Sequence, residues 1–173
     1  MAKYQQPDRR PAVVAGGSSG IGAETAKSLA AAGYPVALGA RRVDECEKLA
    51  AAIRAEGGEA VAHRLDVTDA DSVAEFAAKA GADLGDAEIV VCNAALVAPG
   101  TLFEIETERF AHELDVNLVG AHRLVRTFVP GLVERQRGDI VFVSSDVAMR
   151  ARPFMAAYSA SKWGVEGMVQ ALQ

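Results

Sequence analysis

Short apolar runs alternate with longer stretches of helical periodicity along most of the chain. The apolar runs predict buried strands, and the stretches in which apolar residues recur every three or four positions predict helices. The expected strands are 12–15, 35–40, 60–65, 88–92 and 139–143. The expected helices end at about Ala32 for the first, and cover about 44–57, 69–80, 107–135 and 156–172 for the others.

A helix separates each strand from the next, which predicts parallel pairing with helices on both faces. The expected fold is therefore α/β, a Rossmann-like doubly wound parallel sheet. Five strands are present where such folds usually have six or more, and the chain ends at Gln173 within a helical pattern. We therefore expect the C-terminal strands to be missing from this chain.

The domain organisation follows from the same pattern. Residues 1–10 are expected to form a polar N-terminal tail, and 11–173 a single dinucleotide-binding Rossmann domain that is incomplete at its C-terminus. Arg9 and Arg10 raise the alternative of a twin-arginine export signal. A short strand and a glycine loop follow them instead of the apolar region of a signal, which favours a plain tail.

Two local patterns predict details of the helices. Asp44 and Glu47 have the spacing of a capping box, so Asp44 is expected to cap the second helix. Pro130 predicts a kink near the end of the long helix.

Polar or glycine-rich residues follow every expected strand. They are Gly16–Gly22 after the first strand, Arg41 after the second, Asp66 after the third, Asn93 after the fourth and Ser145 after the fifth. In an open α/β sheet, ligands bind beyond the carboxyl ends of the strands, at the point where the strand order reverses. This coincidence is the strongest indication of a binding site in the sequence.

The glycine loop has the pattern Gly16-x-x-x-Gly20-x-Gly22 and joins a buried strand to a helix. Glycines there permit a tight turn and let backbone N–H groups approach a pyrophosphate at the helix N-terminus. The spacing differs from the commoner G-x-G-x-x-G, and a flexible turn is the alternative.

The corner after the second strand carries Arg41 and Arg42, where an NAD-binding protein is expected to place an acidic residue for the ribose. Guanidinium groups bind phosphate through paired hydrogen bonds, and Ser18 or Ser19 can add a hydroxyl. The corner therefore favours NADP over NAD, with two solvated surface arginines as the alternative.

Tyr158 and Lys162 lie four residues apart in the last expected helix and so share one face. Lowering the pKa of a phenol from about 10 to about 7 requires roughly 4 kcal/mol. One ammonium about 4 Å away supplies about that much at an effective dielectric constant of about 20. The lysine can thus make the tyrosine a usable proton donor or acceptor. Ser145 follows a strand, so its hydroxyl can face the same pocket.

From about Pro11 to Gln173 the chain resembles the short-chain dehydrogenase/reductase family, in its NADP-preferring form. The residues that carry the resemblance are Gly16-Gly-Ser-Ser-Gly-Ile-Gly22, Asp66-Val67, Asn93-Ala-Ala95, Asn117, Ser145 and Tyr158-x-x-x-Lys162. Each motif is weak alone, but together, in this order and on the expected elements, they are highly specific.

The resemblance implies a catalytic tetrad of Asn117, Ser145, Tyr158 and Lys162. Tyr158 would be the general acid/base, and Lys162 would lower its pKa and hold the nicotinamide ribose. Ser145 would hydrogen-bond the substrate oxygen, and Asn117 would support a proton path through Lys162. An alternative role for Asn117 is a hydrogen bond to a neighbouring carbonyl at a helix distortion.

The resemblance also assigns the cofactor contacts. Asp66 would accept from the adenine amine, Val67 would pack nearby, and Asn93 would brace the sheet beside the cofactor. The residues expected at the cofactor are Gly16, Ser18, Ser19, Gly20, Ile21, Gly22, Arg41, Arg42, Asp66, Val67, Asn93, Ala94, Ala95, Tyr158 and Lys162. The chain departs from the family at Ala15, where a threonine is frequent, and at Ala95, where a glycine is usual.

Composition excludes several classes of function. The net charge of −5 argues against nucleic acid or an anionic membrane as partner, and no apolar run is long enough to span a bilayer. Cys46 and Cys92 show no pairing or metal-ligand spacing, so they are expected to be reduced core thiols of a cytoplasmic protein. The three histidines also lack ligand spacing, so no metal site is expected.

The expected activity is an NADP(H)-dependent oxidoreductase that interconverts a ketone or aldehyde with an alcohol. The alternatives are an epimerase or dehydratase on the same scaffold, and a non-catalytic cofactor-binding sensor. The substrate is expected to be a small molecule that the sequence does not identify. An apolar surplus on the long and last helices predicts a dimer or tetramer; it comprises Leu114, Leu118, Val165, Met168 and Val169.

Overall fold

The computed structural model describes residues 9–172. In this part of the chain, five parallel strands form one sheet with the order β3-β2-β1-β4-β5. The strands are β1 (Ala12–Ala15), β2 (Val36–Ala40), β3 (Ala60–Arg64), β4 (Ile89–Cys92) and β5 (Asp139–Phe142). The predicted α/β class with parallel strands is confirmed, and the order reverses between β1 and β4.

The helices follow the predicted pattern closely. They are α1 (Gly20–Ala31), α2 (Val43–Ala55), α3 (Ala70–Leu84), α4 (Thr107–Leu114), the π-helix η1 (Asp115–Val119), α5 (Gly120–Glu134), the 3₁₀-helix η2 (Asp146–Ala148) and α6 (Ala156–Ala171). The third helix continues four residues beyond the predicted end at Ala80. The long predicted helix is divided into α4, η1 and α5, and Pro130 lies inside α5.

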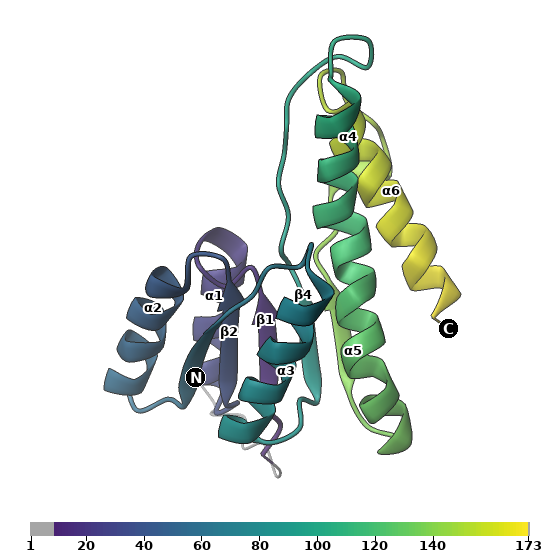
Figure 1. The fold of residues 1–173 in the computed structure, drawn as a ribbon. Helices are drawn as coiled ribbons and strands as arrows, with labels where there is room; N and C mark the ends of the chain where they lie inside the picture. The colour runs from purple at the N-terminus through teal and green to yellow at the C-terminus, as the bar shows by residue number, and fades with distance from the viewer. Residues whose placement is uncertain (1–8, 173) are drawn as a thin grey trace.

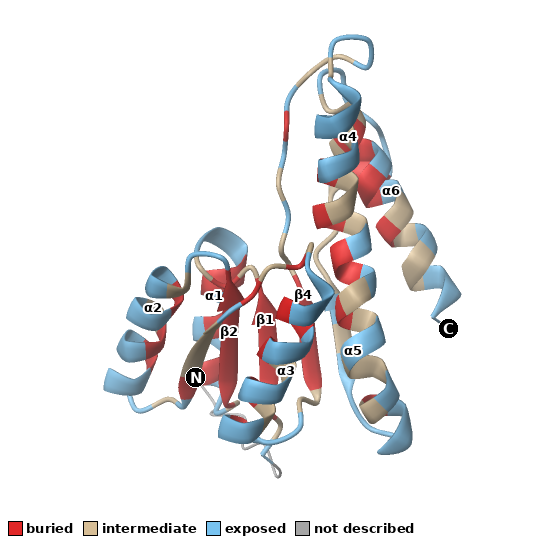
Figure 2. Cartoon of the chain, viewed as in Figure 1, coloured by how far each residue is buried: buried red, intermediate tan, exposed pale blue. Residues whose placement is uncertain are grey.

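Each face of the sheet has its own core because side chains alternate along a strand. Val13, Val90 and Cys92 pack with Phe76 of α3 and Leu124 of α5 on one face. The other face of the sheet is covered by α1 and α2; its core includes Val14, Leu38, Ala26, Cys46 and Ile53. Strands β1, β2 and β4 are buried throughout, as the red colour in Figure 2 shows, whereas the two edge strands β3 and β5 are only partly buried.

Beyond the carboxyl edge of the sheet, α4 and α6 stand together above the other helices, and the chain reaches α4 through a long extended segment after β4 (Figure 1). The main contacts of α6 are with α4, η1 and η2. At Gly164, α6 lies so close to η1 that an added Cβ would be 2.6 Å from a methyl carbon of Leu118. This raised pair of helices forms a wall beside the strand ends.

The predicted capping box at the start of α2 is wrong. The helix begins at Val43 with Arg42 at the N-cap, and no side chain makes a capping bond. Asp44 lies inside the first turn, where its charge favours the helix dipole without capping. Glu47 pairs with Arg54 instead.

Arg9 and Arg10, assigned above to the polar tail, are held against the base of the sheet; residues 1–8 of that tail lie outside the described residues. The Arg10 guanidinium donates to Glu88 at 3.1 Å and to Asp139 at 2.6 Å. Glu88 and Asp139 stand at the start of β4 and β5. Arg10 therefore ties the start of the chain's first strand to the starts of these two strands, at the edge of the sheet opposite the cavity.

Cys46 and Cys92 are both buried and unpaired, which confirms the prediction of core thiols. Burial raises the pKa of Cys92 to about 12 and is also the main cause that raises the pKa of Cys46 to about 11. Both sulfurs therefore stay protonated, and neither is a reactive thiolate. Within residues 9–172 no helix combines the length and the apolar character that crossing a bilayer requires.

Candidate active site

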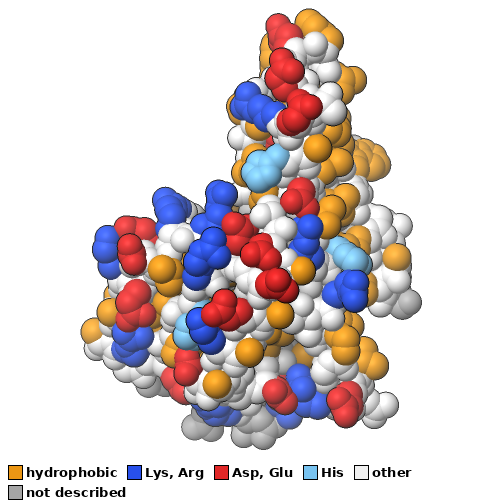
Figure 3. Space-filling view, in the orientation of Figure 1, with side chains coloured by type: hydrophobic (Ala, Val, Ile, Leu, Met, Phe, Trp, Pro, Cys, Tyr) orange, Lys and Arg blue, Asp and Glu red, His pale blue; other side chains and the backbone are white. Residues whose placement is uncertain are grey.

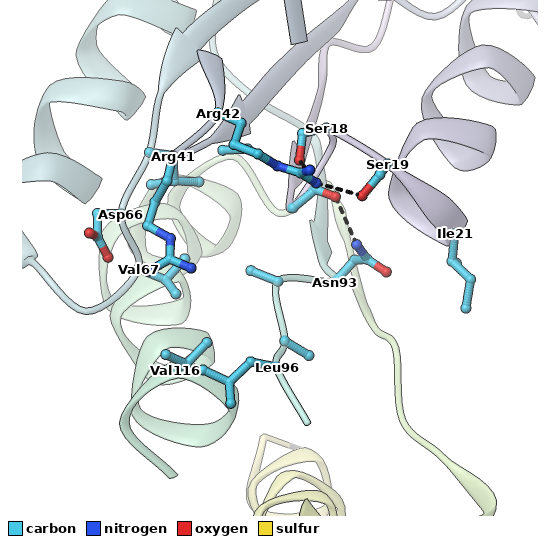
Figure 4. A pocket seen from close by; sticks show the side chains of 15 residues that line it. Ser18, Ser19, Ile21, Arg41, Arg42, Asp66, Val67, Asn93, Leu96 and Val116 are labelled. Atoms are coloured by element: carbon cyan, nitrogen blue, oxygen red, sulfur yellow. Dashed lines mark hydrogen bonds between the residues drawn. The ribbon is translucent and has the colours of Figure 1, made fainter. Parts of the chain in front are cut away.

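The loops that follow β1, β2, β3 and β4 line a cavity of about 360 Å³ at the carboxyl edge of the sheet. Figure 4 shows side chains from these loops converging on this space. The lining residues are Gly16, Ser18, Ser19, Ile21, Ala40, Arg41, Arg42, Leu65, Asp66, Val67, Asn93, Ala94, Ala95, Leu96 and Val116. The structure thus brings eleven of the predicted cofactor residues together in one place.

Some lining residues were not predicted as cofactor contacts. Ala40, Leu65 and Val116 are buried apolar side chains, and nothing in their sequence context separates them from ordinary core. Leu96 is the fourth. It follows Asn93 by three residues, on the segment that leaves the end of β4 and passes the cavity, and its apolar side chain is of the kind expected for a wall of the site.

The glycine loop is built for close backbone approach. Gly16 and Gly20 have φ angles of +81° and +57°, which side chains disfavour. A Cβ on Gly22 would lie 2.3 Å from the Gly16 carbonyl oxygen and 2.5 Å from Nδ2 of Asn93. Asn93 Nδ2 in turn donates to the Gly16 carbonyl at 3.0 Å. The end of β4 therefore locks the loop after β1 in place.

The two arginines after β2 differ in what they already bind. Arg42 donates to the hydroxyls of Ser18 and Ser19 at 3.1 and 2.9 Å. Arg41 extends toward Asp66 and the cavity (Figure 4). Both side chains are exposed, so an incoming anion would meet guanidinium groups on that wall of the cavity.

Asp66 lies after β3 with its carboxylate turned into its own loop. Oδ1 accepts from the Thr68 hydroxyl at 2.7 Å and from the Thr68 backbone N–H at 3.1 Å. Burial alone would raise the pKa of Asp66, but these bonds and the charges of Arg41 and Arg64 outweigh it, so the pKa lies below its ordinary value. Asp66 is therefore a fixed carboxylate at the rim of the cavity.

Tyr158 and Lys162 lie on α6, which contributes none of the described residues that line the cavity. Lys162 is 4% exposed, and its Nζ donates to the Val143 carbonyl at 2.6 Å. The same Nζ is 5.6 Å from the centre of the Tyr158 ring. Burial lowers the pKa of Lys162. The pair is close, as the spacing predicted, and the lysine is held beside the end of β5.

Ser145 lies at the N-cap of η2, three residues after the end of β5. Its hydroxyl donates to Asp146 at 3.2 Å and accepts from the Val147 N–H at 3.3 Å. Both contacts are long for hydroxyl hydrogen bonds, so rotation of the hydroxyl toward another partner costs little.

Asn117 lies in the π-helix η1 and is buried. Its Oδ1 accepts from the Leu96 N–H at 2.8 Å, and its Nδ2 donates to the Leu96 carbonyl at 2.9 Å. Nδ2 also donates to Ser161 of α6 at 3.1 Å. The π-turn widens the helix where this side chain reaches the extended segment after β4. The alternative of a bond to a carbonyl is present, but that carbonyl belongs to a distant segment.

Two further polar groups complete the description of the site region. Glu113, which sequence reasoning missed, is 0% exposed and its Oε2 accepts from the Ala98 N–H at 3.1 Å. His63 contacts Asp83 at 2.7 Å on the surface. Within the described residues, no three His, Cys, Asp or Glu side chains gather as a metal site.

The residues around the cavity have the chemistry that binds a dinucleotide. Its glycine cradle leaves no room for a Cβ at Gly16 or Gly22, its far wall carries two guanidiniums, and it lies where the strand order reverses. These are the features by which doubly wound sheets hold dinucleotide phosphates. The fold and the site define an α/β protein of the dinucleotide-binding class.

The comparisons with known proteins place the chain within that class. The family model described as short chain dehydrogenase matches residues 10–173. The chain belongs to the short-chain dehydrogenase family.

Curated and solved relatives agree. "Uncharacterized oxidoreductase Mb1570" from Mycobacterium bovis is 38% identical over 167 residues, which cover 93% of this chain and 49% of that protein. The alcohol dehydrogenase from the archaeon Thermococcus sibiricus, solved with 5-hydroxy-NADP, has a TM-score of 0.92 at 39% identity and is matched over 96% of this chain and 71% of its own. A metagenomic short-chain oxidoreductase solved with NADP has a TM-score of 0.90 at 35% identity, over 94% and 74%. The chain spans about half the length of the mycobacterial relative.

Proposed function

We propose that this chain forms the cofactor-binding and proton-transfer part of an NADP(H)-dependent oxidoreductase that interconverts a ketone or aldehyde with an alcohol. The observation that carries the proposal is the cavity itself, where a glycine cradle faces two arginines at the switch point of the sheet. The two structural relatives described above were solved with NADP or 5-hydroxy-NADP, which supports the choice of cofactor.

The cofactor would lie across the strand ends. The first turn of α1 and the loop from Gly16 to Gly22 would hold its pyrophosphate, and Asp66 its adenine amine. Arg41 would bind the 2′-phosphate directly, because Arg42 is already held by Ser18 and Ser19. Paired hydrogen bonds from a guanidinium give such a contact both strength and orientation.

A nicotinamide cofactor held by the glycine loop would supply or accept the hydride at the substrate carbon. Tyr158 gives the matching proton to the substrate oxygen in reduction and takes it back in oxidation. Ser145 donates a hydrogen bond to that oxygen once its hydroxyl turns from Asp146. Atoms balance because one hydride and one proton convert a carbonyl to an alcohol.

Lys162 assists the tyrosine electrostatically. Its ammonium is buried and lies beside the Tyr158 ring, where water screens its charge weakly. This placement suits a lysine that assists proton transfer to and from the Tyr158 hydroxyl. Asn117 holds η1, the segment after β4 and α6 together, and so keeps this pair in register with the cavity.

The test of the proposal uses the complete protein and a Tyr158→Phe variant. NADPH oxidation is followed by absorbance with a panel of ketones and aldehydes. We expect turnover by the wild type and at least about a hundredfold loss in the variant, since the proton donor is removed while the ring is kept.

Cofactor binding, measured by NADPH fluorescence, should stay within about threefold in Tyr158→Phe, which separates lost chemistry from lost binding. Equal turnover in the two proteins would contradict the role of Tyr158. Tight NADPH binding with no turnover on any carbonyl would favour the non-catalytic sensor instead.

Cofactor preference is tested by Arg41→Ala. Removing a charged hydrogen-bond donor from a phosphate costs about 1.5–3 kcal/mol, so NADPH affinity should fall about tenfold to a hundredfold while NADH affinity stays nearly constant. Calorimetric titration with both cofactors measures the two losses separately.

Lys48→Ala is a matched control, because Lys48 lies on the exposed side of α2 and pairs with Glu45. It removes one positive charge at a distance from the cavity. If Arg41→Ala weakened NADPH and NADH binding to the same extent, the 2′-phosphate assignment would be wrong.

A further inference from the structure

The extended segment after β4 links the cofactor cavity to the helix that carries Tyr158. Its beginning, Ala94 to Leu96, lines the cavity. Its end is joined to the loop before α6, where the Gly100 N–H donates to the Phe154 carbonyl at 2.9 Å and Gly100 bridges with Met155. We call residues 94–100 the strap. A shift of the strap would therefore move both a cavity wall and the approach to α6.

Two side chains hold the strap along its length, one from α4 and one from the π-helix η1. Asn117 bonds the N–H and the carbonyl of Leu96, and Glu113 accepts from the N–H of Ala98. Four residues of α-helix rise about 6 Å, and two residues of extended chain span about 6.6 Å. The spacing of Glu113 and Asn117 on the helix thus matches the spacing of Ala98 and Leu96 on the strap. We call their three hydrogen bonds the ladder.

The chemistry of Glu113 is unusual for a helix-packing position. The residue is 0% exposed, and its second oxygen, Oε1, is buried without a hydrogen-bond partner in the described part of the chain. An unpaired buried oxygen costs about 1–3 kcal/mol, so an apolar side chain would be more stable there unless the acceptor served a purpose. The structure shows such a purpose, because Glu113 accepts the hydrogen bond from the Ala98 N–H.

We propose that Glu113 is a positioning residue for the cofactor site, because with Asn117 it fixes the register of the strap between the cavity wall and the loop before α6. The inference rests on the proposed function for its consequence on cofactor binding. It deepens that function by assigning a task to a residue outside the tetrad and outside the cavity lining. Glu113 acts through Ala98 and the strap, and not by touching cofactor or substrate.

Burial raises the pKa of Glu113, although the Ala98 N–H and Arg109 act in the opposite direction. An amide has nearly the size of a carboxyl group and keeps an oxygen acceptor. Glu113→Gln is therefore expected to keep the ladder, whereas Glu113→Leu keeps the volume and removes the acceptor.

The experiment compares wild type, Glu113→Gln and Glu113→Leu in the complete protein. Amide hydrogen exchange of residues 94–100 is measured without cofactor, followed by NADPH affinity, kcat and KM. We expect Glu113→Leu to exchange at Ala98 at least about tenfold faster and to lose about tenfold in NADPH affinity. Glu113→Gln should stay within about threefold of wild type in both.

Glu108→Leu is the matched control, since Glu108 lies exposed on the same helix. It should leave the exchange of Ala98 and the NADPH affinity unchanged. A purely structural role for Glu113 would lower the melting temperature of the Leu variant without changing NADPH affinity at a temperature where it is folded, and that result would overturn the proposal.

The wild type provides a measurement that does not depend on the folding of any variant. Its Ala98 amide should exchange about as slowly as the strand amides of Val91 and Cys92. If the Ala98 amide exchanged as fast as that of the exposed Leu102, the hydrogen bond from Ala98 to Glu113 would not form in solution and the proposal would be wrong. If the wild type did not bind NADPH, the proposed function would be wrong. The exchange of Ala98 in the variants would still show whether Glu113 holds the strap.

Discussion

Glu113 and Lys162 are charged residue types that the fold encloses almost completely, and each has a carbonyl or amide partner in a neighbouring segment. Burial shifts the pKa of the acid upward and that of the base downward. In both cases the folded protein favours the neutral form relative to water. Such groups cost stability, and they persist where their position serves the site.

Glu113 gives the stability of the folded protein a pH dependence. Because its folded pKa is raised, the folded state binds the proton more tightly than the unfolded chain does. The tighter proton binding by Glu113 stabilises the folded state. This stabilisation is fully present below the unfolded pKa of about 4.3 and is lost as the pH rises through the folded pKa. Relative to Glu113→Gln, wild type should therefore lose up to about 1.4 kcal/mol per pH unit in that window.

Urea denaturation of both proteins between about pH 4 and about pH 8 measures this difference. The charge of Arg109, one turn earlier on α4, opposes the upward shift of the Glu113 pKa. Arg109→Ala should therefore enlarge the pKa shift and the pH dependence of stability that follows from it. A constant difference between wild type and Glu113→Gln across the range would show that Glu113 does not titrate on folding.

At the scale of elements, the site depends on where α1 begins. The turn from β1 into α1 closes against the end of β4 through Gly16, Gly22 and Asn93. The Gly22 backbone lies against the Gly16 carbonyl and the Asn93 amide group that is hydrogen-bonded to it, so a new side chain at Gly22 has no room. The N-terminus of α1 reaches the cavity only because these three residues pack without intervening atoms.

Gly22→Ala tests this packing. The added Cβ would meet the Gly16 carbonyl at 2.3 Å, so the loop must shift, and we expect at least about a tenfold loss of NADPH affinity with a lower melting temperature. Fluorescence titration and thermal unfolding measure the two effects. Gly81→Ala is the control, because Gly81 lies inside α3 with no atom within 4 Å of the added methyl.

The control should gain about 0.5–1 kcal/mol of stability, as alanine does over glycine in a helix, with unchanged NADPH affinity. An unaffected Gly22→Ala variant would mean that the loop does not form the cradle.

At the scale of the whole molecule, the apolar surplus predicted on the long and last helices is partly used within the chain. Val165 is buried, and Leu118 packs against Gly164, so these two residues are not free for a partner. Two hydrophobic side chains outside the predicted set, Trp163 of α6 and Val119 of η1, are 53% and 39% exposed. Hydrophobic side chains are also visible along the outer edge of the raised helices in Figure 3.

We therefore expect the complete protein to pair with a second copy across α6 and the long helix. Trp163→Glu should shift its mass toward the monomer in light scattering, since a buried charge without a partner opposes association. Ala82→Glu, on the exposed side of α3, is the control and should leave the mass unchanged. A wild type that is monomeric at all concentrations would contradict the pairing.

The sequence by itself determined the parallel α/β fold, the glycine loop, the two arginines and the spacing of Tyr158 and Lys162. These features depend on periodicity and on short-range geometry, which a chain carries locally. Only the tertiary structure decided that Arg42 is held by Ser18 and Ser19, and that α2 has no capping box. It alone placed Glu113 under Ala98, because a contact between residues fifteen positions apart depends on how an extended segment and a helix pack. Such packing is set by the whole molecule, and no local pattern of residues records it.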